Sequence, residues 1–95
     1  MGIIELMDKD FPRDRAFDIQ PTGDEHGFDR FRGTCHSFSH LETAVRRYSS
    51  GRRRERTYHI IGSQQAGYQL AVPIGETHDG KKQYLHLAKL VLIEN

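Results

Sequence analysis

The stretch "RTYHIIGSQQAGYQLAVPI", residues 56–74, decides the fold, because two alternating apolar patterns flank a glycine-rich linker. In the first pattern, Tyr58 and Ile60 fall on one face of a strand, since successive side chains of a strand point to opposite faces. In the second, every other residue from Tyr68 to Ile74 is apolar. The linker between them has the length of a hairpin loop. The stretch therefore predicts two antiparallel strands that share one apolar face.

A third strand is predicted over residues 82–94, after an Asp-Gly turn at residues 79–80 that is typical of hairpins. The apolar alternation in this segment changes parity between Leu87 and Leu90. One extra residue near residues 88–89, as in a β-bulge, restores a single apolar face. A terminal helix is the alternative, because leucine, alanine and lysine are good helix formers. The preceding turn favours the strand.

Before the hairpin, residues 39–51 carry the start and stop signals of a helix. Ser39 and Glu42 have the spacing of a capping box, in which each side chain bonds a backbone N–H of the first turn. Gly51 suits a left-handed C-terminal cap. Four apolar residues fall on one helical stripe: Leu41, Ala44, Val45 and Tyr48.

The first third of the chain, residues 1–34, is acidic and irregular in pattern, because prolines and glycines interrupt every longer run. Residues 2–7 and 15–20 are candidates for short strands that extend the sheet. Phe28 and Phe31 are expected to hold the intervening loop against the core.

These elements predict an α+β fold, in which one helix packs on a small antiparallel sheet built from a three-stranded C-terminal meander. A chain of 95 residues is expected to form a single domain over residues 1–95. Residues 35–95 supply the helix and the sheet core, and residues 1–34 form the irregular acidic segment.

The protein is expected to be cytoplasmic, without a membrane partner. No stretch approaches the roughly 18 to 20 apolar residues that a membrane-spanning helix requires. The first residues have no basic region followed by a long apolar run, as a secretory signal would. The single cysteine, Cys35, has no second cysteine with which to form an internal disulfide, and this fits a reducing compartment.

Positive charge is concentrated after the predicted helix. Residues 46–56 contain six arginines and one glutamate, whereas the whole chain has a formal net charge of +1. Guanidinium groups bind phosphates and carboxylates through paired hydrogen bonds, so the tract is a candidate contact surface for an anionic partner. The candidate binding residues are Arg46, Arg47, Arg52, Arg53, Arg54 and Arg56.

The tract has a second interpretation, as a solvated loop whose charge offsets the acidic side chains of residues 1–45, nine against five basic ones. If the tract does bind a partner, that partner is a protein or a nucleic acid with an anionic surface. The calculated isoelectric point of about 8.0 is lower than the value above about 9 usual for nucleic-acid-binding domains. Opposite charged patches also allow a homodimer. The sequence thus favours a non-enzymatic binding or regulatory module.

A small metal-independent ribonuclease is the alternative function. His59 and His86 lie on the less apolar faces of their predicted strands, where one can act as general base and the other as general acid. Either Arg54 or Arg56 would then stabilise the negative charge of the phosphorane, with Tyr84 nearby.

No metal site and no cofactor are predicted. Cys35, His36 and His40 are close in sequence, and the two histidines have an H-x3-H interval found in zinc sites. However, no second cysteine accompanies them, and His36 precedes the predicted helix. Phosphate-binding loops and nucleotide-binding glycine motifs are absent from the sequence.

Overall fold

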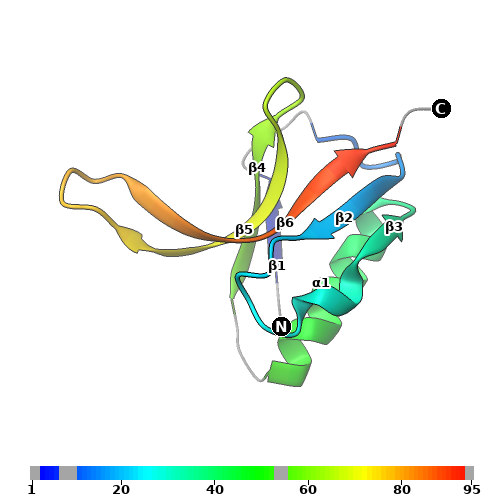
Figure 1. The fold of residues 1–95 in the computed structure, drawn as a ribbon, viewed down its shortest axis with the longest axis horizontal. Coiled ribbons are helices and arrows are strands. Elements are labelled where there is room, and N and C mark those ends of the chain that lie inside the picture. The colour runs from blue at the N-terminus through cyan, green and yellow to red at the C-terminus, as the bar shows by residue number, and fades with distance from the viewer. Residues whose placement is uncertain (1–2, 7–10, 53–55, 94–95) are drawn as a thin grey trace.

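The computed structural model describes residues 3–6, 11–52 and 56–93. Its elements follow in the order β1 (Ile3–Leu6), β2 (Phe17–Pro21), the 3-10 helix η1 (Phe28–Phe31), β3 (Gly33–Cys35), α1 (Phe38–Arg52), β4 (Thr57–Ser63), β5 (Gly67–Glu76) and β6 (Lys82–Leu92). All six strands form one sheet, and α1 lies across one of its faces (Figure 1). The predicted α+β class is therefore confirmed.

The sheet is wider than the predicted three-stranded meander. Its strand order is β1-β4-β5-β6-β2-β3, so the meander β4-β5-β6 lies at the centre. Strand β2 pairs antiparallel with β6, with Phe17 opposite Leu92, and β3 pairs antiparallel with β2. On the other side β1 pairs in parallel with β4. Five strands thus run antiparallel to their neighbours, and the N-terminal segment supplies strands at both edges.

The core lies between α1 and the inner face of the sheet. Leu41 and Val45 of α1 are buried, as the predicted helical stripe requires, and so are Tyr58, Ile60 and Leu70 on the strands. Burial of each such side chain contributes about 1.5 to 3 kcal/mol relative to leaving it exposed. The alternation predicted for the first two strands of the meander is confirmed on this face as far as Val72.

The helix begins earlier than predicted. It starts at Phe38, and the backbone carbonyl of Ser37 accepts hydrogen bonds from the N–H groups of His40 and Leu41, at 3.1 and 3.2 Å. The Ser37 hydroxyl lies 2.9 Å from Nδ1 of His40. The predicted capping box at Ser39 is therefore wrong. Phe38 is buried, and its packing places the first turn one residue sooner.

The C-terminal segment is a strand, as predicted, and it contains a bulge. Leu70 pairs with Ala88 and the next residue, Ala71, pairs with His86, so Leu87 is the extra residue on β6. The predicted position was one residue further along the chain. Leu87 and Ala88 are consecutive and both buried, which a regular strand with one buried face does not allow.

Beyond the bulge, the β5–β6 hairpin projects from the body as a narrow arm (Figure 1). The arm spans residues 73–83 and turns at Gly80, whose φ of 83° lies in the left-handed region. Ile74 has the parity predicted for the apolar face, yet it is 63% exposed, and it is the residue left unpaired where the register shifts between Pro73 and Gly75. Alternation alone therefore overestimated how far the buried face extends.

Candidate anion-binding surface

Arg46 and Arg47 lie on the solvent side of α1. The helix places its buried residues Leu41, Val45 and Tyr48 against the sheet, and a rotation of about 100° per residue carries positions 46 and 47 to the outside. Both arginines are exposed. Among the described residues neither has an ion-pair partner. In the part of the chain that the structure describes, both guanidinium groups are thus exposed and outside any ion pair.

Arg30 adds a third cation next to α1. Its guanidinium carbon lies 4.8 Å from the ring centroid of Phe31 and 5.8 Å from that of Tyr48, the residue after Arg47. Phe28 packs edge-on against the same Tyr48 ring at 5.2 Å and fixes η1 on the helix. The sequence predicted that Phe28 and Phe31 hold a loop against the core. It did not predict that they contact the helix, so Arg30 was not among the predicted binding residues.

Arg56 is occupied inside the molecule. Its two terminal nitrogens donate to the two carboxylate oxygens of Glu25, Nη1 to Oε1 at 2.7 Å and Nη2 to Oε2 at 2.9 Å. The side chains of Arg56 and Glu25 are only 18% and 12% exposed. This paired geometry is the strongest contact that an arginine makes with a carboxylate. One residue of the predicted tract is thus bound by the acidic N-terminal segment.

The ion pair is part of a larger hydrogen-bonded network. The Tyr48 hydroxyl donates to Oε2 of Glu25 at 2.6 Å, and Nη2 of Arg56 donates to the Tyr58 hydroxyl at 3.0 Å. That hydroxyl lies 2.8 Å from Oγ of Ser49. The hydrogen bond to Glu25 raises the pKa of Arg56 above its ordinary value, outweighing burial, which lowers it. The network joins the N-terminal segment, α1 and β4.

The remaining arginines of the tract are only partly covered by the structure. Arg52 is the last residue of α1. Arg53 and Arg54 lie outside the described residues. Of the tract's arginines whose side chains the structure describes, Arg46 and Arg47 are exposed and Arg56 is bound to Glu25.

The residues of the alternative ribonuclease site lie together on the outer face of the sheet. His59 pairs with Ala71, which pairs with His86, so the two histidines share one row across three strands. Two interstrand spacings separate their backbones by about 10 Å. The ring of Tyr84 stands edge-on to that of His59 at 5.9 Å. His59 and Tyr84 line a hollow of about 220 Å³, and His86 does not line it.

Arg56 does not share this face. Its side chain has the parity of Tyr58, and its guanidinium carbon lies 5.1 Å from the Tyr58 ring on the core side of β4. Of the two arginines suggested for the ribonuclease, Arg56 is thus separated from His59 by the sheet, and Arg54 lies outside the described residues.

Cys35 and the two nearby histidines have separate environments. The Cys35 thiol is buried, and its Sγ lies 3.4 Å from the Ser37 carbonyl oxygen. Burial raises the pKa of this thiol. The rings of His36 and His40 stand edge-on at 5.8 Å, and His40 contacts Ser37. Across the described ranges, no group of three or more histidine, cysteine or acidic residues is placed to hold a metal ion.

Comparison with known proteins gave no match: no family model, no curated protein and no solved structure is significantly similar to this chain. In the described part of the chain, α1 is too short and too polar to cross a membrane.

Proposed function

We propose that this protein is a small non-enzymatic binding module that contacts an anionic surface of another macromolecule through the arginines at α1. The observation that carries the proposal is the exposure of Arg46 and Arg47 without an ion pair in the described chain. Arg30, held against the rings of Phe31 and Tyr48, supplies a further guanidinium group at the same helix. A cation that is already positioned loses less side-chain entropy when it binds a partner.

An acidic protein surface is the preferred partner. The net charge of +1 supports this choice, since domains dedicated to nucleic acid are usually strongly basic. Charge complementarity between proteins accelerates association and sets orientation. Nucleic acid is the other class of anionic surface that arginines bind, and the experiment below separates the two.

The test is capture of partners from a cell extract by the wild-type protein and by the double variant Arg46→Gln, Arg47→Gln. The extract is divided, and one half is treated with nuclease. We expect one or a few proteins to be retained in both halves by the wild type and lost by the double variant.

A matched control removes the same charge elsewhere. Lys81→Gln, Lys82→Gln changes two exposed cations near the tip of the arm. This control should retain the captured proteins. Equal capture by both double variants would contradict the proposal. Loss of all capture after nuclease treatment would assign the surface to nucleic acid instead.

Metal-independent cleavage of RNA is the second candidate function, and the common row of His59 and His86 favours it. One imidazole would remove the proton of the ribose 2′-hydroxyl, whose oxygen then attacks the phosphorus. The other would protonate the departing 5′-oxygen. Nδ1 of His86 is buried and has no hydrogen-bond partner in the described chain. This leaves Nε2 as the nitrogen that can face a substrate.

This candidate is tested by incubating a labelled RNA with the protein and a metal chelator. Activity lost in both His59→Ala and His86→Ala, with native circular dichroism, would support cleavage by the histidine row. Intact RNA at high protein concentration would remove the candidate.

A homodimer and a cytoplasmic location stay predictions. Light scattering measures the first, and fractionation of the source cells measures the second.

A further inference from the structure

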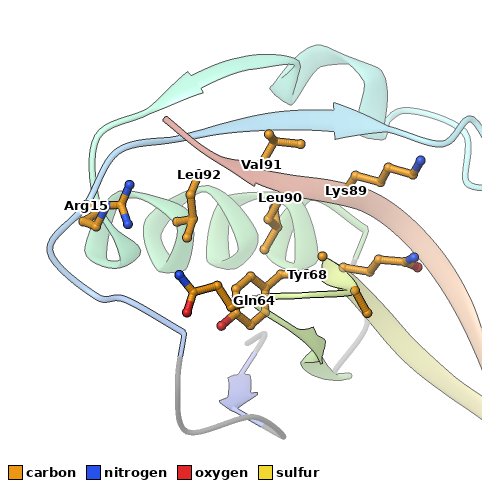
Figure 2. Close-up of a pocket in the computed structure, with 10 residues that line it drawn as sticks. Arg15, Gln64, Tyr68, Lys89, Leu90, Val91 and Leu92 are labelled. Carbon is orange, nitrogen blue, oxygen red and sulfur yellow. The ribbon is translucent and has the colours of Figure 1, made fainter. Parts of the chain in front are cut away.

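A groove of about 400 Å³ lies where the end of β6 runs past the start of β5 (Figure 2). Its size falls within the range of ligand-binding clefts. Leu90 and Leu92 of β6 lie on one side of the groove, and Tyr68 and Gln64 lie on the other. The groove is separate from the arginines at α1, which do not line it.

The groove exists because two strands end at different places beside β6. The pairing of β5 with β6 stops where Tyr68 faces Leu90. The pairing of β2 with β6 continues to Leu92, which faces Phe17. Beyond Leu90, therefore, β6 is still paired with β2 on one side. On its other side, none of the described residues forms a strand that pairs with it.

The hydrogen-bond pattern shows which backbone groups face this gap. The N–H of Thr22 donates to the carbonyl of Leu87 at 3.0 Å, and the N–H of Ile93 donates to the carbonyl of Ala16 at 3.1 Å. Both bonds lie on the β2 side of β6. Because antiparallel strands alternate the side on which a residue bonds, the N–H and C=O of Leu92 point toward the gap.

The ends of the groove are cationic. Arg15 lies at one end, beside Leu92, and Lys89 lies at the other (Figure 2). Nη2 of Arg15 donates to the carbonyl oxygen of Ile93 at 3.0 Å, and this bond holds the guanidinium group at its end of the groove. A guanidinium group has five N–H donors, so others can bind a ligand. Lys89 is exposed, and none of the described residues that line the groove is an aspartate or a glutamate.

We propose that this groove binds an extended acidic peptide segment of a partner protein, which adds as a short strand beside Leu92. A peptide main chain is the ligand that satisfies a strand's free N–H and C=O together. The half-buried side chain of Leu92 gives such a strand an apolar contact, since alternate side chains of a strand point to the same face. Carboxylates on the segment would pair with Arg15 and Lys89, the two cations among the described residues that line the groove. The proposal is independent of the surface at α1.

The test is an NMR titration of the isotope-labelled protein with the blocked pentapeptide Glu-Val-Glu-Val-Glu. We expect saturable shifts at Leu92 and its neighbours, and at least tenfold slower hydrogen exchange of the Leu92 amide when the peptide is bound. A Lys-Val-Lys-Val-Lys peptide should not bind. Lys89→Glu should weaken binding of the acidic peptide at least tenfold, whereas Lys81→Glu at the arm tip should leave it unchanged.

Further measurements separate the alternatives. Acidic peptide methylated on alternate backbone nitrogens should not bind if the main chain is recognised. Equal binding of that peptide, or no shift at Leu92 at millimolar peptide, would overturn the proposal. Protection of Leu92 by a short thymidine oligonucleotide in place of the peptide would overturn it as well. The double variant Arg46→Gln, Arg47→Gln should bind the peptide normally, so failure of the α1 surface and failure of the groove are distinguishable.

Discussion

At the scale of single residues, Glu25 connects the acidic N-terminal segment to the rest of the molecule. Its carboxylate accepts hydrogen bonds from Arg56 and Tyr48 in a half-buried position. The pKa of Arg56 is raised above its ordinary value, so its positive charge persists through the neutral range. The stabilisation from Arg56 is fully present below its unfolded-state pKa and is lost only in strong alkali. Glu25 therefore makes the N-terminal segment part of the stable fold.

Glu25→Gln should lower the free energy of unfolding by about 2 to 3 kcal/mol, because it leaves the guanidinium of Arg56 half-buried without a counter-charge. Urea unfolding followed by circular dichroism measures the change. The control is Arg32→Gln, which breaks an ion pair with Asp29 whose side chains are 61% and 74% exposed. That change should cost less than about 1 kcal/mol. Equal stability of Glu25→Gln and wild type would contradict a structural role for the network.

Cys35 should react slowly with thiol reagents in the native protein and quickly in urea. Its thiol is buried, and burial raises its pKa above the ordinary value of 9.0, so the reactive thiolate is scarce at neutral pH. As the pH rises above 9.0 the unfolded chain ionises before the native one, and the free energy of unfolding falls. Cys35→Ala should remove that component of the alkaline pH dependence. If Cys35 reacted with the reagent as fast in the native protein as in urea, its thiol would be accessible to solvent, which would contradict this prediction.

At the scale of elements, the β4–β5 hairpin depends on Gly62. A Cβ at this position would lie 2.1 Å from the carbonyl oxygen of Gly67, and the φ of Gly62 is 109°. Gly67 has a φ of 89° but open space around it. Gly67→Ala should therefore cost about 1 to 2 kcal/mol from the left-handed backbone alone. Gly62→Ala should cost at least about 2 kcal/mol more, since the backbone must also move. Thermal unfolding compares the two, and equal melting temperatures would contradict the predicted clash.

Sequence predicted the elements that depend on local pattern. The three strands of the meander and the helix were all recognisable from alternation, turn residues and helical spacing. The helix start was wrong because Ser39 fits the capping template, whereas burial of Phe38 decides the observed start. Ile74 was wrongly assigned to the buried face, because alternation alone does not record the register shift between Pro73 and Gly75.

At the scale of the whole molecule, contacts between distant segments could not be predicted from one sequence. Phe17 pairs with Leu92, and Ile3 pairs in parallel with Thr57, so the strand order joins segments that no local signal relates. The same holds for Glu25 and Arg56. The sequence alone showed that residues 46–56 are rich in arginine. The fold decides that Arg56 forms an internal ion pair, whereas Arg46 and Arg47 are exposed on the helix.

If Arg46 and Arg47 contact the partner, the rate of association should depend strongly on salt concentration. Exposed charges are screened over about 10 Å at 0.1 M salt. We expect association of the wild type with its partner to slow by about tenfold between roughly 0.05 and 0.2 M salt, with a much smaller change in dissociation. Stopped-flow or surface-based kinetics measure both rates. An association rate independent of salt would point to a contact without guanidinium groups.

The most direct measurement is the dissociation constant of the captured partner for three proteins at one salt concentration. They are the wild type, Arg46→Gln with Arg47→Gln, and Lys81→Gln with Lys82→Gln. Our account predicts that neutralising the helix pair weakens binding by at least about tenfold, which corresponds to about 1.4 kcal/mol, while the arm pair has little effect. Unchanged affinity of the helix variant, or equal losses in both variants, would contradict it.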